Sequence, residues 1–98
     1  MNSQNLQNKL RDKFLKKGVK MKGPETVFFS KDTKIGKNVE IEPYVVLADK
    51  VKIGNNVKIL SFSHLEGVKI DNDVSVGPYA RLRPGTKIKS GSKIGNFV

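Results

Sequence analysis

The first twenty residues carry their apolar positions at the spacing of an α-helix. Three large apolar residues recur four positions apart among charged neighbours: Leu6, Leu10 and Phe14. This pattern predicts an amphipathic helix of about four turns, with Ser3 or Asn5 as its N-cap and Gly18 as the residue that ends it. Because one narrow apolar stripe does not hold an isolated helix together in water, we expect the helix to pack against the rest of the chain.

From Phe29 onward the apolar positions change to a period of six residues. Large aliphatic residues mark each repeat: Ile35, Ile41, Leu47, Ile53, Ile59, Leu65, Ile70, Val76, Leu82, Ile88 and Ile94. One step is shorter, because Ile70 follows Leu65 after five residues. A second, smaller set follows four positions behind: Val39, Val45, Val51, Val57, Ser63, Val74, Ala80, Thr86, Ser92 and Val98. A sustained period of six indicates the hexapeptide repeats of a parallel β-helix rather than a simple helix or strand.

Three hexapeptides make one coil, so residues one coil apart should stack at about 4.8 Å and resemble each other. Three aliphatic columns result: Ile35/Ile53/Ile70/Ile88, Ile41/Ile59/Val76/Ile94 and Phe29/Leu47/Leu65/Leu82. An aromatic column and a lysine column accompany them: Tyr44/Phe62/Tyr79/Phe97 and Lys34/Lys52/Lys69/Lys87. The sequence therefore predicts an all-β parallel β-helix of about four coils, preceded by one N-terminal α-helix.

Three segments follow from this pattern. Residues 1–20 form the amphipathic helix, residues 21–28 form a connector that contains Gly23-Pro24, and residues 29–98 form the β-helix. The sequence stops at Val98 inside a repeat, so we expect the β-helix to be truncated at its C-terminal end.

Composition narrows the classes of function. The net charge of +10 and a hydrophobic content of 37% fit a small folded domain, and no apolar stretch predicts a membrane span or a secretion signal. The absence of cysteine excludes a disulfide scaffold and a thiol nucleophile, and a single histidine, His64, argues against a metal site. We expect a cytoplasmic protein with neither a membrane nor a nucleic acid as partner.

Several runs of residues resemble one family. They are GPYARLRPG at 77–85, IGNFV at 94–98, SFSHLEG at 61–67, and the connector from Gly18-Val19 to TVFFS at 26–30. Together they resemble the bacterial bifunctional N-acetylglucosamine-1-phosphate uridyltransferase/glucosamine-1-phosphate acetyltransferase, matching only its linker helix and first acetyltransferase coils. One departure is Lys22-Gly23-Pro24, where the family usually has Asp before Pro.

The resemblance implies a left-handed β-helix and a homotrimer of parallel prisms. It also implies that Arg83 holds a sugar nucleotide or sugar phosphate, and that the family uses acetyl-CoA. The family's glycine-rich nucleotide-binding loop has no counterpart here. Its other acetyltransferase groups, including those that contact acetyl-CoA, would fall beyond Val98, so no cofactor is assigned to this chain.

Each candidate residue also has a simpler interpretation. Arg83 stands at a corner where neighbouring repeats carry glycine, and it either forks onto a phosphate or is merely solvated. We interpret Arg81 as a solvated arginine and His64 as a surface histidine on an outward corner, with no catalytic or metal-binding residue assigned. We interpret the lysine column as a solvated surface, with a binding track for an anion or a nucleic acid as the alternative. The aromatic column either stacks on itself or joins the threefold contact.

Two functional hypotheses follow. In the first, the chain is a truncated acetyltransferase-like protein related to the enzyme of UDP-N-acetylglucosamine synthesis and inactive alone. In the second, it is an assembly module that pairs with a separately encoded C-terminal part and rebuilds the acetyltransferase site. In either case a sugar ligand would bind only weakly to the chain by itself.

Overall fold

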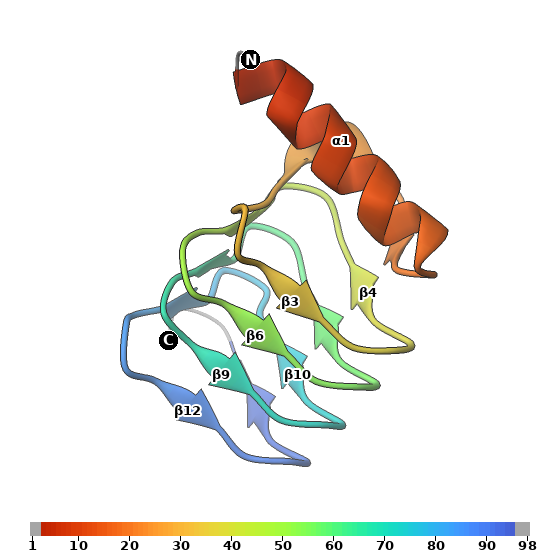
Figure 1. Ribbon diagram of the computed structural model, residues 1–98. Coiled ribbons are helices and arrows are strands. Elements are labelled where there is room, and N and C mark those ends of the chain that lie inside the picture. The colour runs from red at the N-terminus through yellow and green to blue at the C-terminus, as the bar shows by residue number, and fades with distance from the viewer. Residues whose placement is uncertain (1–2, 96–98) are drawn as a thin grey trace.

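The structure of the protein is a computed structural model that describes residues 3–95. One α-helix, α1 (Ser3–Lys16), lies across one end of a solenoid of short parallel strands (Figure 1). A short 3-10 helix, η1 (Pro24–Thr26), lies between the first two strands. Within residues 3–95, no helix combines the length and the apolar character needed to cross a lipid bilayer.

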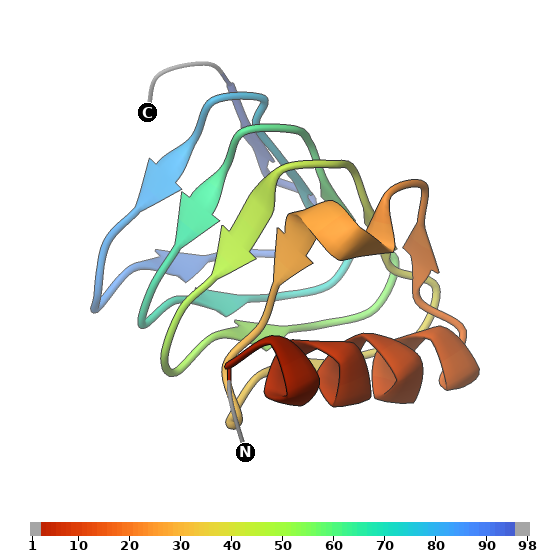
Figure 2. The ribbon, with the colours of Figure 1, turned by 90° about the horizontal axis from the view of Figure 1, so that it is seen from above.

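The strands form three parallel sheets, which make the three sides of a triangular prism (Figure 2). Sheet A contains β1 (Lys20–Met21), β4 (Glu40–Ile41), β7 (Lys58–Ile59), β10 (Ser75–Val76) and β13 (Lys93–Ile94). Sheet B contains β2 (Val27–Phe28), β5 (Val45–Leu47), β8 (His64–Leu65) and β11 (Arg81–Leu82). Sheet C contains β3 (Lys34–Ile35), β6 (Lys52–Ile53), β9 (Lys69–Ile70) and β12 (Lys87–Ile88).

Within each sheet, neighbouring strands are three places apart along the chain, so each sheet advances by one coil per strand. In sheet C, for example, Ile53 lies opposite Ile35 on one side and Ile70 on the other. The aliphatic member of each pair points into the prism, and Ile41, Ile59 and Val76 have no exposed surface. The structure thus confirms the predicted parallel β-solenoid of about four turns with one N-terminal helix.

The five-residue step between Leu65 and Ile70 lies at the corner between sheets B and C. In the preceding coil this corner contains Asp49 and Lys50, whereas the shorter coil has only Gly67 at the equivalent place. Gly67 adopts φ 56, and a Cβ atom there would lie 2.8 Å from Cα of Pro84. The shortened corner therefore needs glycine, and the strands on either side keep their register.

Helix α1 ends at the glycine that the sequence indicates. Gly18 adopts φ 96, its N–H donates to the carbonyl of Leu15 at 3.0 Å, and the N–H of Val19 donates to the carbonyl of Phe14 at 3.0 Å. This is the Schellman pattern, in which the residue after the left-handed glycine packs against the last turn. Phe14 and Val19 are both buried, so the helix end joins the core.

The buried face of α1 is fixed to the first coil by polar contacts as well as by apolar ones. Arg11 is only 9% exposed; its Nε donates to the carbonyl of Val27 at 3.0 Å, and its Nη2 donates to the carbonyl of Glu25 at 3.1 Å. The same guanidinium lies 5.0 Å from the ring centre of Phe28. The helix therefore satisfies backbone carbonyls that no preceding coil covers.

The solenoid begins earlier than residue 29. Lys20 and Met21 pair in register with Glu40 and Ile41, and Val27 and Phe28 pair with Val45 and Val46. The expected connector thus supplies Met21 of β1 and all of β2, whereas Lys20 of β1 comes from the segment that was expected to be helical. These strands are hard to detect in the sequence because η1 separates them and interrupts the six-residue period.

Candidate functional site

The outer face of sheet B brings the predicted arginines together with His64. Arg81 lies in β11, directly beside His64 in β8. Since side chains alternate along a strand, Arg83 points to the same outer side as Arg81, two residues later, while Leu82 points into the core. His64 in one coil and the two arginines in the next therefore form one polar patch on the outer face of sheet B.

Arg83 lies at the corner between sheets B and C, and its backbone closes a turn. Its carbonyl accepts hydrogen bonds from the N–H of Thr86 at 3.2 Å and from the hydroxyl of Thr86 at 2.7 Å. The side chain is exposed, and within residues 3–95 its guanidinium has no hydrogen-bond or salt-bridge partner. The turn holds the backbone while the charge remains available to a ligand.

Sequence reasoning missed Glu66, which occupies the position beside Arg83 in the adjacent coil. Leu65 and Leu82 are in register, so the residues that follow them, Glu66 and Arg83, are neighbours across the two coils. The sequence signal that could have found Glu66 is the five-residue step between Leu65 and Ile70. Because of this step, stacked residues such as Glu66 and Arg83 are seventeen and not eighteen positions apart. The position next to Arg83 in the preceding coil is therefore a glutamate and not a glycine.

His64 is the first residue of strand β8 rather than a corner residue, which corrects the expected position. It is half-buried on the outer face of sheet B, between Val46 of the preceding coil and Arg81 of the following one. Neither neighbour is a carboxylate that could orient an imidazole as a general base. Within residues 3–95, no cluster of three or more acidic or histidine side chains could hold a metal ion.

The aromatic column is a stack of exposed rings at the corner between sheets A and B. We call Tyr44, Phe62 and Tyr79 the aromatic ladder. The ring centres lie 5.3 Å apart for Tyr44 and Phe62 and 5.0 Å apart for Phe62 and Tyr79, with interplanar angles of 4° and 9°. The rings of the column therefore stack on one another, which was one of the two interpretations of this column. Its fourth expected member, Phe97, lies outside the described residues.

A small acidic cluster lies at the corner between sheets B and C in the first coils. The hydroxyl of Ser30 lies 2.8 Å from Oδ1 of Asp32 and 2.9 Å from Oδ1 of Asp49. The hydrogen bond from Ser30, and another from the N–H of Lys50, lower the pKa of Asp32 below its ordinary value. These contacts tie consecutive coils together at their corner.

Comparison with known proteins agrees with this geometry. The family described as "Bacterial transferase hexapeptide (six repeats)" matches residues 32–67. The chain is 52% identical over 92 residues to a protein named "Bifunctional protein GlmU" from Zymomonas mobilis subsp. mobilis, covering 94% of this chain and 20% of the relative. Proteins of the same name from Azorhizobium caulinodans and Wolbachia pipientis wMel are 50% and 48% identical, over 95% and 94% of this chain. The chain spans about a fifth of the length of these relatives.

Proposed function

We propose that this chain, which is homologous over nearly its whole length to about a fifth of bacterial GlmU proteins, supplies the helix and first coils of a hexapeptide acetyltransferase domain. In this role the coils are a scaffold, and the chain's contribution to the site is Arg83. The observation that carries the proposal is the exposed guanidinium of Arg83, held on a fixed turn and without a hydrogen-bond or salt-bridge partner among residues 3–95. An arginine of this kind can bind a phosphate through two parallel hydrogen bonds.

The ligand class that fits Arg83 is a sugar phosphate or a sugar nucleotide. Arg81 lies on the same face and adds positive charge, whereas Glu66 beside Arg83 can accept hydrogen bonds from a sugar hydroxyl or amine. A phosphate on the arginine side and a polar sugar on the carboxylate side would satisfy both groups. This arrangement supports binding, and we expect it to be weak in the chain alone because the patch is open to solvent.

The proposal assigns no acetyl-transfer chemistry to residues 3–95. Acetyl transfer from a thioester to an amine requires a base placed at the amine, and His64 has Val46 and Arg81 as its strand neighbours instead of an orienting carboxylate. No contact with acetyl-CoA is assigned either. We therefore expect the chain alone to be inactive.

A direct assay tests this expectation. The purified chain is incubated with acetyl-CoA and glucosamine 1-phosphate, and release of the CoA thiol is followed. We expect no release above the protein-free blank, and turnover by the chain alone would overturn the proposal.

Binding is tested separately by titrating glucosamine 1-phosphate into the chain and following amide chemical shifts. Arg83→Gln should weaken binding by about tenfold, the loss of one charge-assisted pair. Arg81→Gln is the matched control on the same face and should change binding by less than about twofold. Equal losses in the two variants would contradict the assignment of Arg83.

The second candidate function is that of an assembly module. It is favoured by the observation that the match covers about a fifth of each relative, because Arg83 would then work beside residues from the remaining coils. Mixing this chain with a polypeptide that carries the remaining coils of such a relative should produce acetyl transfer that neither part shows alone. Arg83→Gln should abolish the activity of the mixture, and a mixture without activity would contradict the module.

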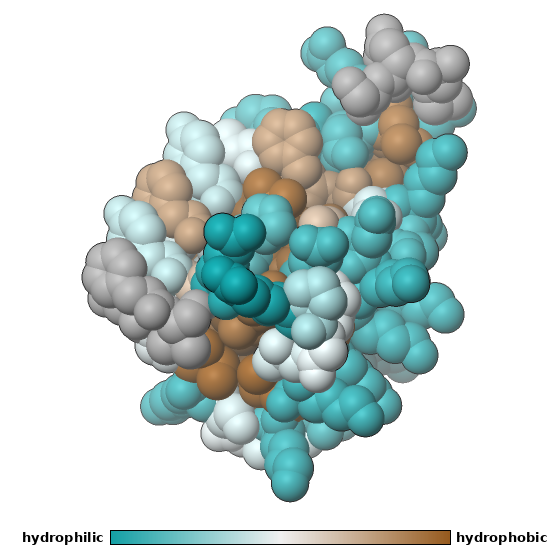
Figure 3. All heavy atoms as spheres, turned by 90° about the vertical axis from the view of Figure 1, so that its left-hand side faces the viewer, coloured by the Kyte–Doolittle hydropathy of each residue, from teal (hydrophilic) through white to brown (hydrophobic). Residues whose placement is uncertain are grey.

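We also propose a homotrimer of parallel prisms, with the aromatic ladder facing the threefold axis. The ladder rings are about half exposed, with Phe62 at 51%, and the adjacent outer face of sheet B adds Phe28 at 46%. Figure 3 shows the side on which sheet B lies, where hydrophobic residues are exposed between hydrophilic ones. Four exposed aromatic rings close together on one side are more typical of a protein–protein interface than of a surface in contact with water. Sedimentation equilibrium should give three times the mass of the chain, and Phe62→Asp should shift it to the monomer.

A further inference from the structure

The outer face of sheet C carries four lysines in a single line. Lys34, Lys52, Lys69 and Lys87, which we call the lysine row, are paired directly with one another across β3, β6, β9 and β12. Parallel strands are about 4.8 Å apart, so the row spans about 14 Å along the axis of the solenoid. All four side chains are exposed.

The lysine row differs from sheet A in its ion pairing. On sheet A, by contrast, Glu40 lies beside Lys58 and their charged groups are 4.0 Å apart. Within residues 3–95, no member of the lysine row has a salt-bridge partner. Like charges placed directly opposite each other in a sheet repel, so a bound anion would relieve an unfavourable arrangement.

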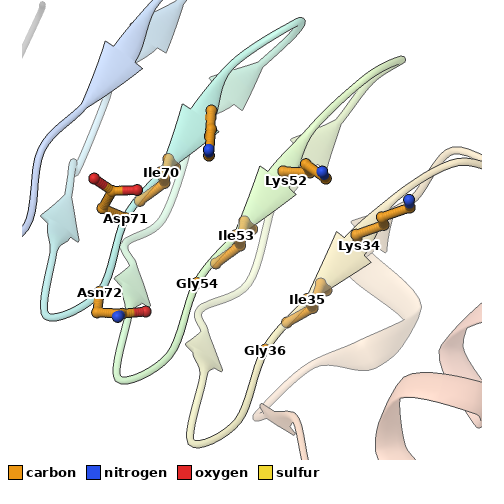
Figure 4. A pocket seen from close by; sticks show the side chains of 10 residues that line it. Lys34, Ile35, Gly36, Lys52, Ile53, Gly54, Ile70, Asp71 and Asn72 are labelled. Atoms are coloured by element: carbon orange, nitrogen blue, oxygen red, sulfur yellow. The ribbon is translucent and has the colours of Figure 1, made fainter.

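The surface beside the row is shallow and has a backbone floor. Gly36 and Gly54 stand two residues after Lys34 and Lys52 (Figure 4). They have no side chain of their own, and the side-chain oxygens of Asn55 and Asn72 from the following coils lie against them. In the third coil Asp71 takes the place of glycine, and its carboxylate lines the groove beside Lys69. A narrow anion can thus lie along the lysines, with glycine backbone at its flank.

The glycines have a structural reason of their own, and this makes the groove a permanent feature. A Cβ atom on Gly54 would lie 2.6 Å from Oδ1 of Asn72, which accepts a hydrogen bond from the N–H of Asn55 at 2.8 Å. The corners that carry Asn55 and Asn72 therefore require glycine in the preceding coil. The groove is built into the fold and does not depend on a side-chain rotation.

We propose that the lysine row binds a linear polyphosphate chain, a polyanion with a charge on every unit and no side groups. Its phosphates can follow a straight row of ammonium groups, each of which acts as a mobile point charge. Single-stranded nucleic acid fits less well, because unpaired bases bind by stacking on aromatic rings. The ring stack of this protein, the aromatic ladder, is at the opposite corner, between sheets A and B.

The test is binding of end-labelled inorganic polyphosphate to the full chain, followed by fluorescence anisotropy over a series of salt concentrations. The double variant Lys52→Gln/Lys69→Gln should weaken binding by about tenfold or more, since two close ion contacts are lost. The slope of log affinity against log salt should fall by about 1.4, or about 0.7 for each lost phosphate contact. Lys52→Arg/Lys69→Arg should retain binding.

The matched control is Lys20→Gln/Lys93→Gln, which removes the same charge from exposed positions on sheet A. It should change the affinity by less than about twofold. Circular dichroism checks that each variant keeps its β structure. Equal losses in the two double variants would show a mere net-charge effect and overturn the proposal. So would a lack of binding at about 50 mM salt, or tighter binding of an oligothymidylate of equal charge.

Discussion

The side-chain amide of Gln7 pairs with the backbone of Phe29 in both directions. Its Nε2 donates to the carbonyl oxygen of Phe29 at 2.8 Å, and its Oε1 accepts from the N–H of Phe29 at 2.8 Å. This is the hydrogen-bond pattern that a neighbouring strand would supply. Helix α1 thus closes the first coil of sheet B with one amide in place of a strand.

Replacement of Gln7 should destabilise the fold measurably. In Gln7→Leu both polar backbone groups of the buried Phe29 lose their partners, at a cost of about 1–3 kcal/mol in the free energy of unfolding. Urea unfolding followed by circular dichroism measures the change. Gln4→Leu, an exposed position one turn earlier, should stay within about 0.5 kcal/mol of the wild type. Equal effects would show that the paired amide does not matter.

Gly77 should tolerate no side chain, for two separable reasons. It adopts φ 95, and a Cβ atom would lie 2.5 Å from Oγ of Ser63. We expect Gly77→Ala to cost about 2–5 kcal/mol of stability, the sum of left-handed strain and overpacking. Gly85 has φ 89 with no atom within 4 Å of its Cβ position, so Gly85→Ala should cost only about 1–2 kcal/mol.

Thermal unfolding of these variants separates strain from the steric clash. In a Ser63→Ala background the clashing oxygen is absent, and the additional cost of Gly77→Ala should fall toward that of Gly85→Ala. An unchanged cost in that background would mean that backbone strain alone explains the requirement for glycine.

An alanine substitution at the centre of the aromatic ladder should reduce the stability of the fold more than one at its end. Phe62 stacks on two rings, whereas Tyr44 stacks on one, and both residues have φ 63. Alanine therefore has the same backbone strain at either position. Phe62→Ala should cost about 1–3 kcal/mol and Tyr44→Ala about half of that, because each stacked pair contributes about 0.5–1.5 kcal/mol beyond burial. Comparison of their urea midpoints at a protein concentration where both are monomeric checks the difference, and equal costs would contradict it.

Lowering the pH should remove the stabilisation that the carboxylate of Asp32 contributes at the corner of the first coils. The hydrogen bonds from Ser30 and from the N–H of Lys50 lower the pKa of Asp32 in the folded state. A lowered folded-state pKa means that the contribution is fully present above the unfolded value of about 3.9 and is lost as the pH falls through the folded value. Asp32→Asn should therefore be less stable than the wild type at pH 6, and the gap should narrow below about pH 4.

Thermal unfolding from pH 6 to pH 2 measures this gap. Asp12→Asn, on an exposed position of α1, is the control for a general loss of negative charge. A gap between the wild type and Asp32→Asn that stays constant down to pH 2 would contradict the assignment.

The regular part of the fold could be predicted because each position repeats its neighbour's environment. Ile53, for example, has isoleucine above and below it, and that repetition is visible in the sequence alone. The start of the solenoid could not be predicted in the same way. Lys20 and Met21 pair with the first full coil, but Gly23 and η1 break the six-residue spacing before β2.

The candidate site was predictable only in part, because single residues specify it rather than a repeat. Arg83 was proposed as a site residue from the run that contains it, whereas the position of Glu66 beside it depends on where the missing residue of the short repeat falls. The pairing of Gln7 with Phe29 depends on the direction in which α1 crosses the first coil. The periodicity of the sequence contains no information about that direction. Contacts between the helix and the coils therefore needed the three-dimensional structure.

Because the strands keep the same register from coil to coil, the solenoid spaces its residues along the axis in equal steps. Inserting one complete coil between β5 and β8 would move Arg83 away from α1 by about 4.8 Å along the axis while leaving it on the same face. Distance from the helix and orientation about the axis are thus independent quantities in this architecture. Evolution or design can change the first in fixed increments without altering the second.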